Sequence, residues 1–139
     1  NFPDIKIIFS VHKNPNVKKI IEKKLKNIKN LFLINSQNYL NFVYLIKKCF
    51  FIISDSGGLQ EEVTYFGKPI IVFRETTERE EIKNTNSVIV TTDLNKIFNK
   101  IENLIHSKIF YQKYSNKNFL FGRGNSSEKI IKLILKNLK

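Results

Sequence analysis

The sequence predicts an α/β fold in which a parallel sheet is flanked by helices. Short apolar runs rich in Ile, Val, Leu and Phe, typical of buried strands, alternate with longer segments whose apolar residues recur at helical spacing. No internal repeat and no linker interrupts this alternation, so we expect the 139 residues to form a single domain. A chain of that length can bury one core of ordinary size.

Capping residues and apolar spacing define the N-terminal elements. Asn14 can cap a helix that has Pro15 at its first position, and the apolar residues that follow recur every three or four positions. In chain order we expect a strand at 5–11, a helix beginning at Pro15, a strand at 31–34, a polar turn at 35–38 and a helix at about 39–48.

An apolar run at 50–54 should form a third strand, buried on both faces, and it leads toward two adjacent glycines. Gly57 and Gly58 let the backbone turn sharply and approach a ligand, and the helix that starts there offers unpaired N–H groups and a positive dipole end. These residues predict an anion site. Taken alone, they fit an ordinary strand-to-helix turn capped by Ser56 or Asp55 equally well.

Turn residues divide the second half of the chain. Gly67 suits a left-handed helix stop, and Pro69 prevents the helix from continuing. In chain order we expect a helix at 59–66, a strand at 70–73, a polar loop at 74–87 and a strand at 88–90. A helix at about 94–105, capped by Asp93, a helix at about 107–115 and a loop at 117–125 follow. Asn125 and Glu128 should open the last helix as a capping box. Ligands of such sheets bind beyond the carboxyl ends of the strands, so the segments after the strands should line one edge.

The net charge of +12 would be typical of a protein that binds nucleic acid. The excess is almost entirely lysine, and it is accompanied by Asn, Ile and Phe, the residues that an A/T-rich coding sequence favours. Most of the acidic residues fall in and after the glycine turn, whereas a nucleic-acid groove would be basic there. We therefore expect no nucleic-acid partner.

Cysteine and histidine are too few and too far apart for a metal site. Cys49 is the single cysteine, and His12 and His106 lack zinc-like spacing, so we expect no metal. We also expect no cofactor. No apolar run approaches the ~20 residues that a membrane span needs. We expect no membrane partner and a cytoplasmic location.

Four short motifs follow one another along the chain. They are Val-His-Lys-Asn-Pro-Asn-Val at 11–17, Asp-Ser-Gly-Gly-Leu-Gln-Glu-Glu at 55–62, Gly-Lys-Pro at 67–69 and Arg-Glu-Thr-Thr-Glu-Arg at 74–79. In this order they resemble the non-hydrolysing UDP-N-acetylglucosamine 2-epimerases. The resemblance covers nearly the whole chain but only the C-terminal half of such an enzyme, the second of two Rossmann-like domains in a GT-B type fold. Because the chain also starts at Asn1, we expect a fragment without the N-terminal catalytic half.

The resemblance implies a UDP site and no catalytic residue within this chain. Ser56, Gly57 and Gly58 would hold the diphosphate, and Glu62 would accept hydrogen bonds from the ribose hydroxyls. The other implied contacts are Gln37 and Phe42 to the uracil, Arg79 to the substrate, and His12 at the domain cleft, where some relatives bind a second, activating UDP-N-acetylglucosamine.

Each of these side chains also has a purely structural interpretation, and the sequence leaves both open. Glu62 could complement the helix dipole, and Arg79 could form a solvated ion pair with a neighbouring glutamate. Phe42 could belong to the core, Gln37 to the turn, and His12 could bond to nearby backbone.

Three positions depart from the family pattern. Ser10 and Glu80 stand where relatives have proline, and the second change affects the loop that carries Arg79. Arg123 stands where relatives have an aspartate, so a hydrogen-bonding role there is in doubt.

The activity implied is interconversion of UDP-N-acetylglucosamine and UDP-N-acetylmannosamine by elimination and re-addition of UDP, in cell-envelope polysaccharide synthesis. This chain would supply the UDP-binding half, and the full-length enzyme would be a homodimer. The alternatives are another GT-B type UDP-sugar enzyme, either a glycosyltransferase or a hydrolysing 2-epimerase, and a degenerate domain that binds UDP-sugar without catalysis.

Overall fold

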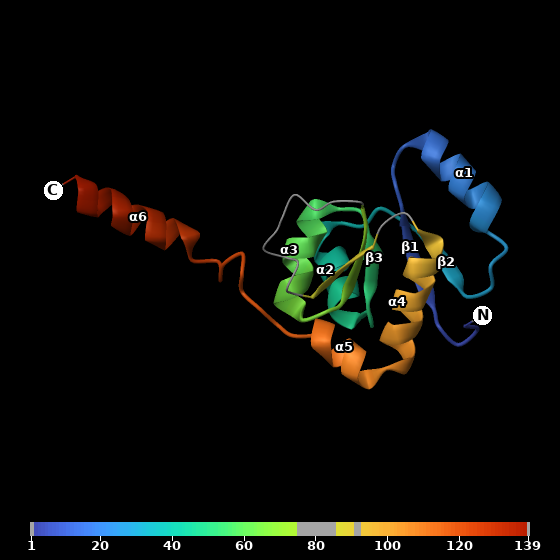
Figure 1. Ribbon diagram of the computed structural model, residues 1–139. Coiled ribbons are helices and arrows are strands. Elements are labelled where there is room, and N and C mark those ends of the chain that lie inside the picture. The colour runs from blue at the N-terminus through green and yellow to red at the C-terminus, as the bar shows by residue number, and fades with distance from the viewer. Residues whose placement is uncertain (1, 75–85, 91–92, 139) are drawn as a thin grey trace. The chain divides into compact units, whose positions relative to one another are not determined.

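The computed structural model describes residues 2–74, 86–90 and 93–138, which are drawn as a coloured ribbon in Figure 1. Contacts within the chain divide it into two compact units. The first unit comprises residues 1–45 and the second residues 46–139. Each unit is described by itself below.

The first unit is built on two parallel strands. Its elements are β1 (Ile7–Val11), α1 (Pro15–Leu25), β2 (Leu31–Asn35) and the first turns of α2 (Tyr39–Lys48). The register runs from Ile7 opposite Leu31 to Val11 opposite Asn35, so both strands end at the same edge. Asn14 caps α1 as predicted, because its side chain accepts the Asn16 N–H at 2.9 Å.

The second unit contains a three-stranded parallel sheet in the order β3-β4-β5. Its elements are β3 (Ile52–Ser54), α3 (Gly57–Phe66), β4 (Ile70–Phe73), β5 (Ser87–Val90), α4 (Leu94–His106), α5 (Lys108–Tyr114) and α6 (Ser126–Asn137). Ser54 pairs with Val72, and Phe73 pairs with Val90, so the carboxyl ends of the three strands share one edge. The predicted parallel pairing is confirmed.

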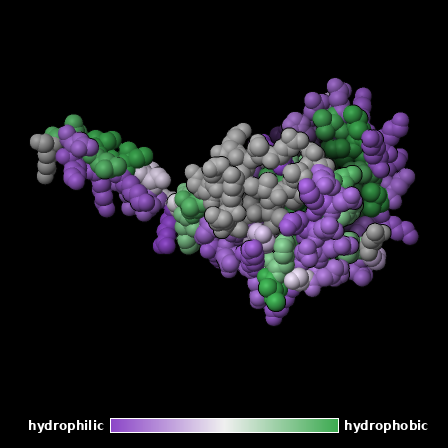
Figure 2. Space-filling view, viewed as in Figure 1, coloured by the Kyte–Doolittle hydropathy of each residue, from purple (hydrophilic) through white to green (hydrophobic). Residues whose placement is uncertain are grey.

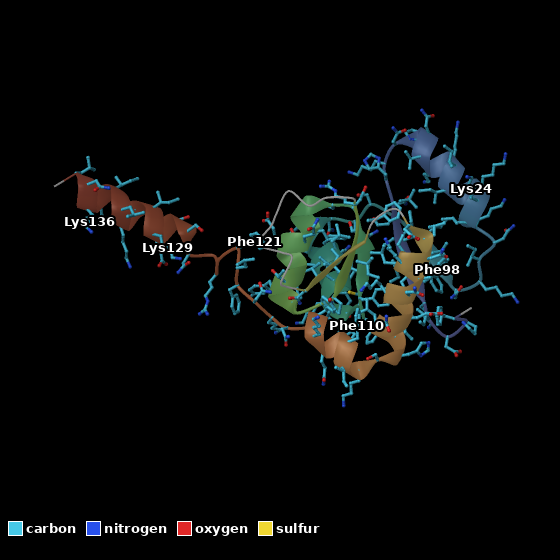
Figure 3. The ribbon with its side chains drawn as sticks, viewed as in Figure 1. Lys24, Phe98, Phe110, Phe121, Lys129 and Lys136 are labelled. Carbon is cyan, nitrogen blue, oxygen red and sulfur yellow. The ribbon has the colours of Figure 1, made fainter. Side chains whose placement is uncertain are left out.

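The core of the second unit lies between β4 and α4. Ile70, Ile71 and Val72 are fully buried, as expected for a central strand of a parallel sheet. Ile71 packs with Ile97 and Leu104, which lie on one face of α4 because they are seven residues apart. The ring of Phe110, labelled in Figure 3, comes from α5 and packs against this cluster.

The expectation that residues 50–54 form a strand buried on both faces is wrong. The strand begins at Ile52, and Ile53 is 51% exposed; within the described residues of the second unit, β3 pairs with β4 alone. Phe50 instead stacks on Tyr111, with ring centroids 4.3 Å apart, and its carbonyl accepts the Tyr111 hydroxyl at 3.0 Å. Phe50 therefore contacts α5 and takes no part in strand β3.

The predicted capping box of the last helix does not form. Asn125 occupies the cap position of α6 but makes no side-chain capping bond, since its φ of −106° and ψ of 22° are not the extended conformation that a cap needs. The apolar side chains of α6 are all at least half exposed, and Figure 2 shows hydrophobic and hydrophilic side chains together on its surface. Lys129 and Lys136 extend from the same helix (Figure 3).

Candidate functional site

The glycine turn follows β3 and opens α3. Ser56 is extended, with φ −75° and ψ 125°, and its hydroxyl accepts the Leu59 N–H at 3.5 Å. The Ser56 N–H donates to Ser54 Oγ at 3.1 Å. Ser56 is therefore the helix cap. As at any helix start, the N–H groups of Gly57 and Gly58 have no acceptor within the helix, so an anion can bind them.

The two glycines are not needed for a sharp turn, which corrects the sequence-based expectation. Among the described residues, positive φ angles occur only at Gly67, Gly122 and Gly124. At Gly58 a β-carbon would meet no atom within 4 Å. Neither conformation nor packing therefore requires glycine at position 58, where alanine would favour the helix.

Glu62 and Gln60 lie farther along α3. Glu62 is half-buried and stands one helical turn beyond Gly58, and its contact with the ribose stays a prediction. Gln60 is 1% exposed, and its side-chain amide donates to the Ser56 carbonyl at 3.3 Å. Sequence reasoning missed Gln60. The available signal was its spacing from Val63 and Thr64, which places an amide on the buried face of the helix.

Gln37 and Phe42 belong to the first unit, after β2. Gln37 Nε2 donates to the Asn35 carbonyl at 2.7 Å, and its Oε1 accepts from Asn41 Nδ2 at 3.4 Å. Asn38 caps α2 by accepting the Asn41 N–H at 2.9 Å. Gln37 thus has the turn role that the sequence left open, and it retains further hydrogen-bonding capacity. Phe42 is half-buried on α2.

His12 follows β1 at the same edge as the turn after β2. It is exposed, and its Nδ1 accepts the Asn14 N–H at 3.2 Å. The predicted bond to nearby backbone is therefore present, and in the neutral ring Nε2 carries the proton.

Arg79 and Glu80 lie outside the described residues. Arg74, the first residue of the same loop, follows β4 at the edge where the glycine turn lies, and its N–H donates to the Val72 carbonyl at 3.0 Å. Arg123 is the third departure from the family pattern. Its guanidinium carbon lies 4.6 Å from the centroid of the Phe119 ring.

The described residues hold no group of three or more His, Cys, Asp or Glu side chains that could bind a metal. In the same part of the chain, no helix combines the length and apolar character needed to cross a membrane. Burial raises the pKa of the Cys49 thiol, and nearby Lys68 partly offsets this effect. A raised pKa fits a structural rather than reactive cysteine.

Comparison with known proteins identifies the family. The model of the UDP-N-acetylglucosamine 2-epimerase family matches residues 1–135. The chain belongs to this family. The UDP-N-acetylglucosamine 2-epimerase of Campylobacter jejuni is 44% identical over 137 residues, which are 98% of this chain and 36% of that protein. The Yersinia pestis enzyme is 39% identical over 133 residues, 95% of this chain and 35% of that protein.

Solved structures of epimerases show the same fold. The Neisseria meningitidis enzyme bound to UDP-GlcNAc has a TM-score of 0.89 at 39% identity and matches 97% of this chain and 37% of its own. The Methanocaldococcus jannaschii enzyme in complex with UDP-GlcNAc and UDP has a TM-score of 0.75 at 32% identity, over 94% and 36% of the two chains. The predicted GT-B type α/β fold is confirmed. The chain spans little more than a third of the length of these epimerases.

Proposed function

We propose that this chain is the UDP-holding part of a non-hydrolysing UDP-N-acetylglucosamine 2-epimerase. One observation carries the proposal: in a chain of this family, α3 starts at the carboxyl edge of the sheet with open space at Gly58. Unpaired N–H groups and the positive end of the helix dipole favour a diphosphate at such a position.

The residue roles are proposals of the same kind. Ser56, Gly57 and Gly58 bind the diphosphate, and the half-buried Glu62 accepts hydrogen bonds from the ribose. The remaining contacts are Gln37 and Phe42 with the uracil, Arg79 with the substrate and His12 with the cleft or an activating nucleotide sugar. Gln37 can also donate a hydrogen bond to the uracil, because its bond to the Asn35 carbonyl uses only one of its two amide hydrogens.

The proposed site acts on the leaving group. Cleavage of the anomeric C–O bond places negative charge on the departing diphosphate. Amide dipoles already aimed at that charge stabilise the transition state more than the ground state. In this proposal, the acid and base that act on the sugar belong to a part of the epimerase that residues 1–139 do not match. We therefore expect the isolated chain to bind UDP but not to epimerise UDP-N-acetylglucosamine.

The proposal includes the setting of this activity. Residues 1–139 act as one UDP-binding domain, and the complete enzyme is a homodimer in the cytoplasm that supplies N-acetylmannosamine units for cell-envelope polysaccharide. Size-exclusion chromatography with light scattering, together with cell fractionation, tests the assembly and the location.

A chimaeric enzyme tests the activity. Residues 1–139 replace the matching segment of the C. jejuni relative, with which they share 44% identity. Proton NMR should show UDP-N-acetylmannosamine accumulating from UDP-N-acetylglucosamine with the chimaera, and no conversion with the 139-residue chain alone. Free N-acetylmannosamine would instead indicate a hydrolysing enzyme. A folded chimaera without turnover, or turnover by the isolated chain, would contradict the proposal.

A further inference from the structure

Gln60 is an unusual residue to bury in α3. Its side chain is 1% exposed, on the same face as Val63, which is fully buried. Glutamine is costly to bury unless its amide is hydrogen-bonded, because the amide loses its bonds to water. Here the amide donates to the Ser56 carbonyl at 3.3 Å, and that carbonyl belongs to the turn proposed to hold the diphosphate.

The Ser56 carbonyl and the Gly57 N–H are parts of one peptide group. A trans peptide is planar, and its C=O and N–H point in opposite directions. A side chain that holds the carbonyl toward the protein therefore directs the Gly57 N–H away from it, toward the exposed start of the helix.

This peptide needs such a contact more than an ordinary helix start does. Gly57 and Gly58 have no side chains to restrict the backbone, and glycine adopts many conformations at little cost. The other side-chain contact described here, from the Ser56 hydroxyl to the Leu59 N–H, is long at 3.5 Å. The amide of Gln60 adds a side-chain bond to the Ser56 carbonyl, beside the first backbone bond of the helix, and so restricts this peptide further.

We propose that Gln60 is a positioning residue that holds the Ser56 carbonyl and so aims the Gly57 N–H at the diphosphate of the bound nucleotide. The inference rests on the proposed function, since it concerns the same nucleotide site. Gln60 itself touches no substrate in this account. Its effect should therefore be confined to the phosphate end of the ligand.

The test compares UDP with uridine, which lacks phosphate, by NMR titration of the 139-residue chain. Gln60→Met keeps the volume but removes the donor. The Ser56 carbonyl still accepts the first backbone bond of the helix, so the variant should fold. Loss of one net hydrogen bond should weaken UDP binding about fivefold. Uridine binding should change by less than about twofold, because its proposed contacts lie elsewhere.

Thr64→Val is the matched control. Thr64 is also 1% exposed on α3, and its hydroxyl donates to the Glu61 carbonyl at 2.7 Å, one turn farther from the glycines. A merely structural role for Gln60 would make the two variants alike, with lower melting temperatures and unchanged preference for UDP over uridine. Equal effects of Gln60→Met on UDP and uridine, or no effect on UDP, would overturn the inference.

The wild-type chain provides a measurement that does not depend on the variant folding. The side-chain amide resonance of Gln60 should shift on addition of UDP and not of uridine, and the Gly57 N–H should shift with it. Absence of these shifts while UDP binds would contradict the positioning role alone. A wild-type chain that does not bind UDP would contradict the proposed function and this inference with it.

Discussion

At the residue scale, Gly58 and Gly67 stand at opposite ends of α3 for different physical reasons. Gly67 has a φ of 64°, and a β-carbon there would lie 2.9 Å from the Ser115 carbonyl oxygen. Backbone conformation and packing both require glycine at this position. Gly58 meets neither requirement, and in the proposed site the open space there admits the diphosphate.

Alanine substitution separates these two roles. Gly58→Ala should leave stability unchanged or raise it by up to about 1 kcal/mol, because alanine is the better helix former. Its methyl group should weaken UDP binding about tenfold, or about 1.4 kcal/mol, by occupying the space in front of the helix. Urea unfolding and UDP titration measure the two effects.

Gly67→Ala is the control, and it should show the reverse pattern. It should lose about 1–2 kcal/mol of stability while the folded fraction binds UDP normally. Gly58→Ala with unchanged UDP affinity would remove the main structural support for the phosphate site.

Residue roles were predictable from sequence where they depend on near neighbours. Asn14 and Gly67 were assigned correctly because a helix cap involves only the adjacent turn. Gln60 was missed although its spacing from Val63 and Thr64 places it on the buried face of α3, because a glutamine is usually exposed. Arg79 lies outside the described residues, and its role stays a prediction.

At the element scale, two helix starts show when a capping residue that the sequence predicts forms its capping bond. Asp93 caps α4 as predicted, and its Oδ1 accepts the N–H groups of Asn95 at 2.9 Å and Lys96 at 3.4 Å. Asn125 has an equally suitable side chain, but its backbone is not extended and no capping bond forms. The residue type was right in both places, and backbone conformation decided the outcome.

This difference predicts unequal costs for the same substitution. Asp93→Ala should destabilise the protein by about 1 kcal/mol, because two N–H groups at the start of α4 lose their acceptor. Asn125→Ala should change stability by less than about 0.5 kcal/mol. Urea unfolding followed by circular dichroism compares the two. Equal losses would mean that Asn125 does cap α6 in solution.

Contacts between segments far apart in the chain could not be predicted from sequence patterns. Asn118 Nδ2 donates to Asn86 Oδ1 at 3.0 Å, and the Asn118 N–H donates to the Thr64 carbonyl at 3.1 Å. The first bond ties the segment after α5 to the residue before β5, and the second ties it to the end of α3. Asparagine in a loop is usually a turn residue, and nothing local distinguishes one whose partner is 32 positions away.

At the scale of the whole molecule, most of the architecture could be predicted. Parallel strands alternating with helices follow from the spacing of apolar residues, and the motif order indicated the family that the comparison shows. The exposure of Ile53 on β3 was missed, because a short apolar run predicts a strand without showing how far each face is buried. The chain matches 36% of the C. jejuni enzyme, so the activity of a whole epimerase stays a proposal.

Calorimetric titration of the 139-residue chain with UDP tests the central claim most directly. The account predicts saturable heat at about one UDP per chain, with a Kd of about 10 μM to 1 mM. CDP, which differs only in its base, should bind less tightly. No saturable heat at millimolar UDP from the folded chain would contradict the assignment of the glycine turn as a nucleotide site.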